Sequence, residues 1–431
     1  MEKIPVNKNF IWAEAFINQL SDLGVRHACI SPGSRSTPLV STLTKNKKIK
    51  CFVHIDERVS GFFALGIAKT TGVPVIVVTT SGTATAELYP AIIEACQQRV
   101  PLIVCTADRP PELWKSGANQ TINQWDLYKN HIRWFKNAGL PDLSSIRIAA
   151  IKKIAVKAFE ISKNQKTGPV HLNFPFRKPL DKDSNTDELD IAMVDELTKP
   201  IPIETTELEI SDFTKREKRQ VENIYSKLNE HSNGLIIVGP MNYYEDFVRN
   251  VKVLSNITRY PILADGVSNL RFGCSDTELT ICSNYDAFLR SDNFRKNHKP
   301  EIIIHFGRTV TSVTLQNYMD ETKPRQFVIN TFGDPVYPSA SGRTVLKFEP
   351  NKFCEKLIER LKESKPKGKR NTWRKDFETA EEILETFKKK QIKNSDKKIE
   401  PPIITTALAS VRSNTHVMLG NSLPIRDVDW F

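Results

Sequence analysis

The sequence predicts an α/β protein built from successive three-layer domains whose sheets are mainly parallel. Short apolar segments alternate with helix-length segments, which is the pattern of repeated β-α-β units. The apolar segments are continuous and do not alternate with polar residues. Continuous apolar segments are typical of strands that are buried on both faces of a parallel sheet.

The first alternating region begins with a helix. Trp12, Phe16, Leu20 and Leu23 are spaced to share one helical face, and Gly24 suits the end of that helix. Further helices are expected from Pro38 onward, over 57–71, over 82–95 and over 146–163. The intervening strands are expected over 27–31, 50–55, 73–80, 101–107 and 168–176.

A second alternating region follows a polar, acidic stretch. Its strand candidates are 234–239, 260–265, 301–307 and 325–330. A Lys-rich segment then contains an expected helix over 378–387, and a last strand is expected over 415–420 before a loop. We therefore expect a first domain over 1–185, a linker over 186–210, a central α/β domain over 211–360, and a linker helix with the start of an incomplete third domain over 361–431.

Composition and charge narrow the class of protein. Of the 431 residues, 39% are hydrophobic and 26% are charged, which is ordinary for a globular protein. The chain has no run of about 18 apolar residues and no apolar segment at its start, so we expect no membrane span and a cytoplasmic location. The net charge of +12 arises mainly in late Lys-rich segments without a nucleic-acid motif, so we expect no nucleic-acid partner.

One candidate site lies in the segment 30-ISPGSRSTPL-39, which runs from a strand through a glycine turn into a helix. Free backbone N–H groups at a helix start favour binding of an anion. Arg35 adds a planar, charged guanidinium group that can bind a carboxylate or phosphate through two hydrogen bonds. A capped helix with a surface arginine is the alternative explanation. The segment does not contain the G-x-G-x-x-G pattern of dinucleotide-binding proteins.

Two more polar residues follow apolar strands. Glu57 and Arg109 each come after a strand, where the carboxyl ends of parallel strands open onto a crevice. Asn119 and Gln120 offer amide groups in the loop beyond Arg109. The alternative explanations are structural: Glu57 stabilises the first turn of a helix capped by Asp56, and the loop contains ordinary turn-forming residues.

The sequence resembles the 2-succinyl-5-enolpyruvyl-6-hydroxy-3-cyclohexene-1-carboxylate (SEPHCHC) synthase family of thiamine-diphosphate (ThDP) enzymes. The segments that carry this resemblance are 31-SPGSRSTPL-39, 54-HIDER-58, 81-SGTATAELYPA-91, 106-TADRPPEL-113, 116-SGANQT-121 and 419-LGNSLPIRDVD-429. The resemblance covers nearly the whole chain and is strongest over 8–135. It implies the ThDP-enzyme fold, with a pyrimidine-binding first domain and the start of a diphosphate-binding domain over 361–431.

The resemblance also implies roles for individual residues. Glu57 is expected to be catalytic and to hydrogen-bond the aminopyrimidine of ThDP, and Gly82 and Thr83 are expected to bind the cofactor. The expected substrate-binding residues are Ser34, Arg35, Arg109, Asn119, Gln120, Ser422 and Arg426.

The implied activity is that of a ThDP-dependent transferase in menaquinone biosynthesis. Such an enzyme decarboxylates 2-oxoglutarate and adds the succinyl semialdehyde carbanion to isochorismate. The implied cofactors are ThDP and Mg²⁺ or Mn²⁺. The implied assembly is a homodimer or tetramer whose active site lies between subunits.

The sequence departs from the family pattern in two places. The family's metal-binding motif is a Gly-Asp pair followed a few turns later by an Asn. The only Gly-Asp pair here is Gly333–Asp334, which lies in the central domain and is followed too soon by Asn351. No residue is therefore assigned to the metal, and its ligands are expected beyond Phe431. Val313 stands where the family commonly has a lysine. The alternative function is therefore a truncated, non-catalytic remnant or binding subunit of this family that lacks the Mg-diphosphate site.

Overall fold

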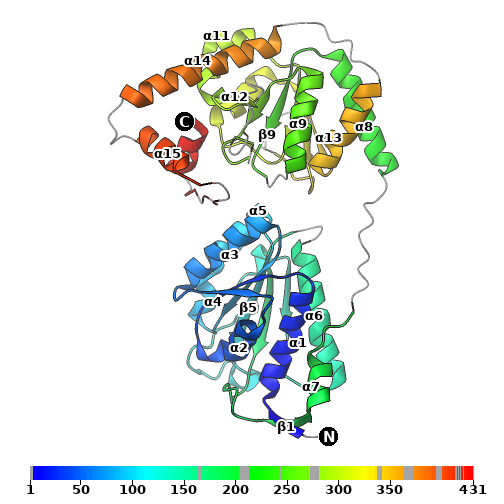
Figure 1. Ribbon diagram of the computed structural model, residues 1–431, viewed down its shortest axis with the longest axis vertical. Helices are drawn as coiled ribbons and strands as arrows, with labels where there is room; N and C mark the ends of the chain where they lie inside the picture. The colour runs from blue at the N-terminus through cyan, green and yellow to red at the C-terminus, as the bar shows by residue number, and fades with distance from the viewer. Residues whose placement is uncertain are drawn as a thin grey trace. The chain divides into compact units, whose positions relative to one another are not determined.

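The computed structural model divides the chain into two compact units, residues 1–205 and residues 206–431 (Figure 1). It describes residues 3–163, 167–202, 213–241, 245–268, 270–271, 281–336, 342–363, 372–394, 400–412, 415, 417, 419–420 and 422–430. Among the described residues, no helix combines the length and the apolar character needed to cross a membrane.

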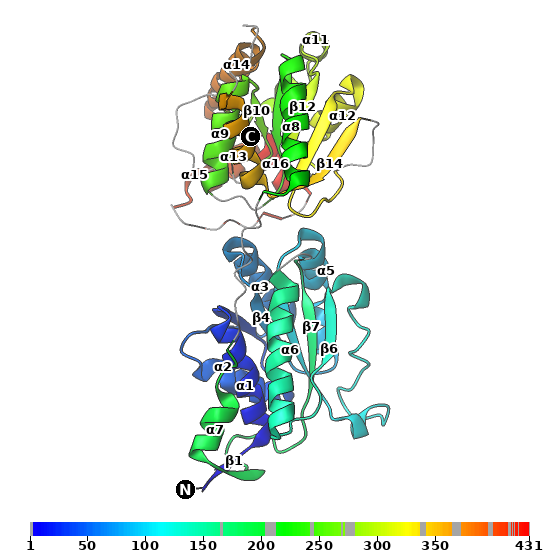
Figure 2. The same ribbon diagram turned by 90° about the vertical axis from the view of Figure 1, so that its right-hand side faces the viewer.

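The first unit contains a six-stranded sheet in which all neighbouring strands are parallel, in the order β3-β2-β4-β5-β7-β6. The strands are β2 (His27–Ile30), β3 (Lys50–Val53), β4 (Val75–Thr79), β5 (Leu102–Asp108), β6 (Trp134–Asn137) and β7 (Val170–Pro175). The view in Figure 2 shows β6 and β7 side by side. Strands β4, β5 and β7 are buried at every position, which explains their largely apolar sequences.

Helices cover both faces of this sheet (Figure 1). One face packs against α1 (Lys8–Asp22), α2 (Thr37–Lys45) and α6 (Ser145–Lys163), and the other against α3 (Glu57–Thr71) and α5 (Tyr89–Gln98). Short elements complete the unit: 3-10 turns over Ser34–Ser36, Pro111–Leu113 and Lys129–His131, and the helix α4 (Thr83–Glu87). This three-layer arrangement confirms the predicted fold class.

The helix expected over 82–95 is two helices, α4 and α5, which meet at Leu88. Pro90 lies in the first turn of α5. Because proline has no backbone N–H and disfavours helical geometry in the residue before it, it suits a helix start and not a helix interior.

The expected linker over 186–210 contains ordered elements of the first unit. β8 (Asp187–Asp190) pairs antiparallel with β1 (Lys3–Val6), and α7 (Ile191–Thr198) packs against α1. Leu197 is buried in the core of the first unit. The segment is mainly polar in sequence, but its few apolar side chains are sufficient to attach it to α1.

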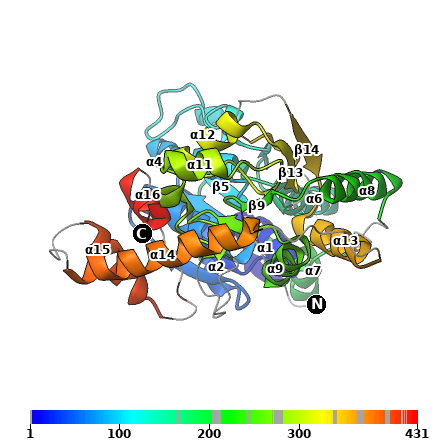
Figure 3. The same ribbon diagram turned by 90° about the horizontal axis from the view of Figure 1, so that it is seen from above.

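The second unit has its own six-stranded parallel sheet, in the order β11-β10-β9-β12-β13-β14. The strands are β9 (Gly234–Val238), β10 (Ile262–Ala264), β11 (Ile281–Cys282), β12 (Ile302–Phe306), β13 (Arg325–Asn330) and β14 (Arg343–Lys347). One face packs against α8 (Lys215–Glu230), α9 (Glu245–Thr258) and α13 (Pro350–Glu363). The other packs against α10 (Tyr285–Phe288), α12 (Val313–Thr322) and the long helix α14 (Trp373–Asn394), which is prominent in Figure 3.

The remaining helices of the second unit are α11 (Asp292–Asn297), α15 (Glu400–Ala409) and α16 (Leu423–Trp430). The expected strand over 415–420 is not formed by the described residues of that segment, none of which pairs with the second sheet. Residues 423–430, expected in a loop, form α16, in which Asp427, Val428 and Asp429 are buried. Cys274 and Asn421 lie outside the described residues.

Candidate functional site

The carboxyl ends of several strands of the first sheet place polar residues around one surface pocket. Because these strands are parallel, the residues that follow β2, β3, β4, β5 and β7 meet at the same edge of the sheet. The pocket is lined by Pro32, Gly33, Ser34, Arg35, Glu57, Thr80, Thr83, Ala84, Glu87, Arg109, Gln120, Lys178 and Leu180. All of these residues belong to the first unit.

The structure brings most of the predicted residues of this unit together. Those that line the pocket are Ser34, Arg35, Glu57, Thr83, Arg109 and Gln120. Gly82 directly precedes Thr83 and has a φ of +81°, and a Cβ added to it would lie 3.0 Å from the carbonyl oxygen of Gln120. Asn119 is exposed and does not line the pocket. The roles of these residues in binding stay predictions.

Glu57 presents a carboxylate that no residue in the described part of the chain engages. It is the first residue of α3, whose N-cap Asp56 accepts a hydrogen bond from the backbone N–H of Arg58 at 2.9 Å. The Arg58 guanidinium also hydrogen-bonds Asp56 and thereby lowers the pKa of that carboxyl to about 2. Glu57 itself makes no hydrogen bond or ion pair with the residues that the structure describes. Its carboxylate is therefore available to a ligand.

Two guanidinium groups contribute positive charge to the same pocket. Arg35 is buried and donates from Nη1 to the carbonyl oxygen of Phe176 at 2.8 Å, while its Nε is buried with no partner in the described part of the chain. Arg109 donates to the Ser81 hydroxyl and to Gln120 Oε1. Burial lowers the pKa of both arginines, and the charge of Arg109 lowers that of Arg35 further. An anionic ligand would stabilise the charged form of both guanidinium groups, which burial and their mutual repulsion disfavour.

Gly33 allows the turn that carries Arg35 to approach β4. A Cβ added at Gly33 would lie 2.3 Å from Cβ of Thr80, so no other residue fits without moving the backbone. Thr80 directly follows β4 and lines the pocket, although the sequence did not identify it as a site residue.

Lys178 is a second pocket residue that sequence reasoning missed. It follows the buried strand β7 by three residues and is exposed at the pocket. A basic residue after an apolar strand is the pattern that identified Arg109, but Arg177 precedes Lys178 and fits that pattern equally, so the sequence alone does not select Lys178.

The two remaining predicted residues, Ser422 and Arg426, lie in the second unit, just before and within α16. Arg426 donates from Nε to the carbonyl oxygen of Ser422 at 3.1 Å and from Nη2 to its hydroxyl at 3.3 Å. Both residues are exposed. They therefore form a small, locally organised polar group at the start of the helix.

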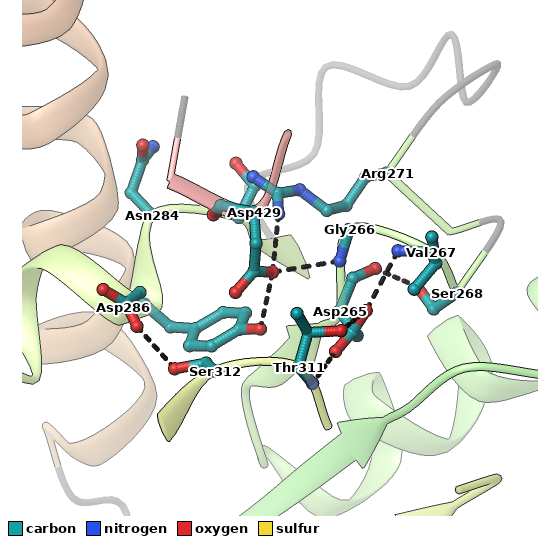
Figure 4. A network of polar contacts seen from close by, with 12 residues as sticks. Asp265, Gly266, Val267, Ser268, Arg271, Asn284, Asp286, Thr311, Ser312 and Asp429 are labelled. Atoms are coloured by element: carbon teal, nitrogen blue, oxygen red, sulfur yellow. Dashed lines mark hydrogen bonds and ion pairs between the residues drawn. The ribbon is translucent and has the colours of Figure 1, made fainter. Parts of the chain in front are cut away.

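Asp429 anchors α16 inside the second unit (Figure 4). Its Oδ1 accepts hydrogen bonds from the backbone N–H of Gly266 at 3.0 Å, from Arg271 Nη1 at 3.1 Å and from the Tyr285 hydroxyl at 2.9 Å. Burial, together with the nearby charge of Asp265, raises the pKa of Asp429 to about 6, and Arg271 opposes the shift. The helix is thus held by a carboxylate whose ionised form is poorly stabilised.

The residues that depart from the family pattern also lie in the second unit. Val313 is exposed in the first turn of α12, after the N-cap Ser312. Asp334 belongs to a turn in which its backbone N–H donates to Asn330 Oδ1 at 2.8 Å. The described residues contain no group of three or more His, Cys, Asp or Glu side chains arranged to hold a metal ion.

Comparison with known proteins finds similar sequences over nearly the whole chain. Residues 12–127 match the family described as "Thiamine pyrophosphate enzyme, N-terminal TPP binding domain". The chain is also similar to several proteins named 2-succinyl-5-enolpyruvyl-6-hydroxy-3-cyclohexene-1-carboxylate synthase. It is 34% identical to that of Chloroflexus aurantiacus, over 97% of this chain and 69% of the relative. It is 32% identical to that of Haloquadratum walsbyi, over 99% of this chain and 72% of the relative, and 34% identical to that of Bacillus cytotoxicus, over 97% and 69%.

Proposed function

Because the chain belongs to the SEPHCHC synthase family of ThDP-dependent transferases, we propose that the pocket of its first unit binds the aminopyrimidine of ThDP next to the carboxylates of 2-oxoglutarate and isochorismate. The observation that carries this proposal is the presence of Glu57, Arg35 and Arg109 in one pocket. A free carboxylate suits a polar heterocycle, and two guanidinium groups suit polyanionic substrates.

The pocket residues fit the pyrimidine end of ThDP. Glu57 offers a carboxylate without a partner among the described residues, and Thr83, directly after Gly82, lines the same pocket. When bound, ThDP supplies the electron sink that decarboxylation of a 2-oxo acid requires. Glu57 would hold a hydrogen bond to a ring nitrogen of the aminopyrimidine and exchange a proton with it. No described residue is assigned to Mg²⁺ or Mn²⁺.

The arginines would position the substrates. Nε of Arg35 is a hydrogen-bond donor without a partner among the described residues, and a carboxylate oxygen would satisfy it. Arg109 offers a second guanidinium, which Ser81 and Gln120 hold in place. Lys178 adds a third cation to the same pocket. Together these groups favour a 2-oxo acid with two carboxylates over one with a single carboxylate.

A second copy of the chain is proposed to cover the face beside Glu57. Ile55 is 89% exposed, and Val59, Phe62 and Phe63 on α3 are also exposed. A group of large exposed apolar side chains next to a binding pocket is typical of a protein interface. A homo-oligomer would remove these side chains from water and shield the pocket.

Assays of the purified chain would test the proposed function. With 2-oxoglutarate, isochorismate, ThDP and Mg²⁺, the measurements are the product formed and the calorimetric binding of 2-oxoglutarate. We expect Glu57→Gln to reduce turnover by at least about 100-fold, because proton exchange is lost, while binding of 2-oxoglutarate is retained. Binding without turnover in the wild-type chain would favour the alternative of a non-catalytic binding subunit. Absence of both would contradict the proposal.

A further inference from the structure

A chain of buried hydrogen bonds crosses the carboxyl edge of the first sheet. It joins the side chains of Gln124, Asn173 and Asp108, which are at most 1% exposed. Gln124 Nε2 donates to Asn173 Oδ1 at 2.8 Å, and Asn173 Nδ2 donates to Asp108 Oδ2 at 2.8 Å. None of the three residues lines the pocket. They therefore act on a ligand only through other residues.

Backbone groups set the direction of this chain. The backbone N–H of Gly82 donates to Gln124 Oε1 at 3.0 Å, and the carbonyl oxygen of Ala107 accepts from Gln124 Nε2 at 3.2 Å. A backbone N–H can only donate and a carbonyl can only accept, so the Gln124 amide has one orientation. Asn173 must then turn its oxygen toward Gln124 and its NH₂ group toward Asp108. The Asp108 carboxylate accepts the hydrogen bond from that NH₂ group.

Each end of the chain lies at a residue predicted to bind a ligand. Gly82 starts the turn that leads into Thr83 and α4. At the other end, Asp108 Oδ1 accepts from the backbone N–H of Arg109 at 2.7 Å. Burial raises the pKa of Asp108, and the hydrogen bond from Asn173 opposes that shift. One directed chain thus joins the expected cofactor turn to the expected substrate-binding arginine.

We propose that Gln124 and Asn173 are positioning residues that fix the position of the Arg109 backbone relative to the turn at Gly82. The inference rests on the proposed function of the pocket. A side-chain amide is required at Gln124 because it must accept from one backbone group and donate to another at the same time. The orientation of Asn173 then follows from Gln124, and the role of Asp108 as acceptor follows from Asn173.

Exchanging Asp108 and Asn173 tests this directed chain. In the double variant D108N/N173D, the new carboxylate at 173 still accepts from Gln124 and from the Thr106 hydroxyl, and the new amide at 108 supplies the donor that faces it. The oxygen of that amide still accepts from the backbone N–H of Arg109, and the net charge is unchanged. Each single variant instead places two acceptors or two donors against each other. Gln124→Leu removes all three hydrogen bonds of the glutamine.

The measurements are calorimetric binding of 2-oxoglutarate without ThDP, steady-state KM and kcat where the chain turns over, and hydrogen exchange of the Gly82 N–H. Val170→Ala is the control. It creates a cavity in β7, the strand that contains Asn173, but removes none of the hydrogen bonds of Gln124, Asn173 and Asp108. We expect both single variants and Gln124→Leu to bind at least about tenfold more weakly, with faster exchange at Gly82. Val170→Ala and the double variant should bind like wild type.

Several outcomes would overturn the inference. Wild-type binding in the folded single variants would do so, as would a folded double variant that binds as weakly as the single variants. If the single variants do not fold, the double variant and Gln124→Leu still decide the question. Wild-type protein that does not bind 2-oxoglutarate would instead refute the proposed function, which separates the two failures.

Discussion

At the scale of single residues, the site is defined by side chains whose charge or hydrogen-bonding capacity the protein leaves unused. Glu57 has no partner in the described structure, and Nε of Arg35 is buried without one. Most buried polar groups in proteins are hydrogen-bonded, so an exception at the edge of a parallel sheet indicates a place for a ligand. Arg109 differs because two neighbouring side chains already hold its guanidinium.

Replacing Arg109 tests the charge of the pocket. We expect Arg109→Gln to weaken 2-oxoglutarate binding by at least about tenfold, because a charge-assisted hydrogen bond to a carboxylate is lost. Calorimetry would measure the affinity. Arg177→Gln is a matched control, since Arg177 is an exposed arginine of the same unit that pairs with Glu112 at 2.6 Å. An equal loss in both variants would show that only the net charge of the protein matters.

At the scale of elements, the positions of the site residues follow from the parallel strands. A strand that ends at the pocket edge brings the residues that follow it to the pocket: Arg109 directly follows β5, and Glu57 begins the helix that follows β3. α16 of the second unit is positioned differently. Asp429 anchors it among Asp265, Arg271 and Tyr285, and Lys388 also contributes charge to this group.

The packing of α16 should depend on pH. The pKa of Asp429 is raised from 3.8 to about 6 when the helix is packed, mainly by burial, so the packed state binds the proton more strongly than the free helix does. The stabilising effect of the proton is therefore complete below about pH 4 and is lost as the pH rises through 6. Hydrogen exchange of residues 423–430, corrected for intrinsic rates, should be about tenfold slower near pH 5 than near pH 7.5.

Asp429→Asn should remove this dependence. The asparagine oxygen can accept the hydrogen bonds from Gly266, Arg271 and Tyr285 without a negative charge. Asp427→Asn in the same helix is the control and should keep the pH dependence of the wild type. If the wild-type exchange rates of 423–430 are the same at both pH values, the packed helix does not bind the extra proton.

At the scale of the whole molecule, the chain consists of two units that each bury their own cores. The first unit buries apolar side chains on both faces of its sheet, and so does the second. The exposed apolar residues on α3 do not belong to either core. They support the proposal that a second copy of the chain packs beside Glu57.

Charging this face should dissociate the oligomer. We expect Phe62→Lys to raise the dissociation constant at least about tenfold, because a lysine in place of an apolar side chain at the centre of an interface leaves a buried charge. Light scattering over a range of concentrations would measure it. Phe387→Lys is a control, because Phe387 is a similarly exposed phenylalanine on α14 of the second unit. A wild-type chain that is monomeric at all concentrations would contradict the proposal.

The sequence by itself determined the α/β fold class, most of the strands, and several pocket residues. These features are local: a buried parallel strand is mainly apolar, and the polar residues shortly after it lie near the sheet edge. Glu57 and Arg109 could be identified in this way, whereas the same rule applied to β7 does not distinguish Lys178, which lines the pocket, from Arg177, which does not. The motifs around Arg35 and Gly82 also identified the family.

Only the tertiary structure decided which of these residues share a pocket and what holds them there. Thr80 lines the site beside Gly33, whose missing side chain allows their close approach, and Asn119 lies outside the pocket although its neighbour Gln120 lines it. The series of hydrogen bonds from Gly82 through Gln124 and Asn173 to Asp108 joins residues that are far apart in sequence. Their distances are set by strand order and side-chain direction, which no local pattern specifies.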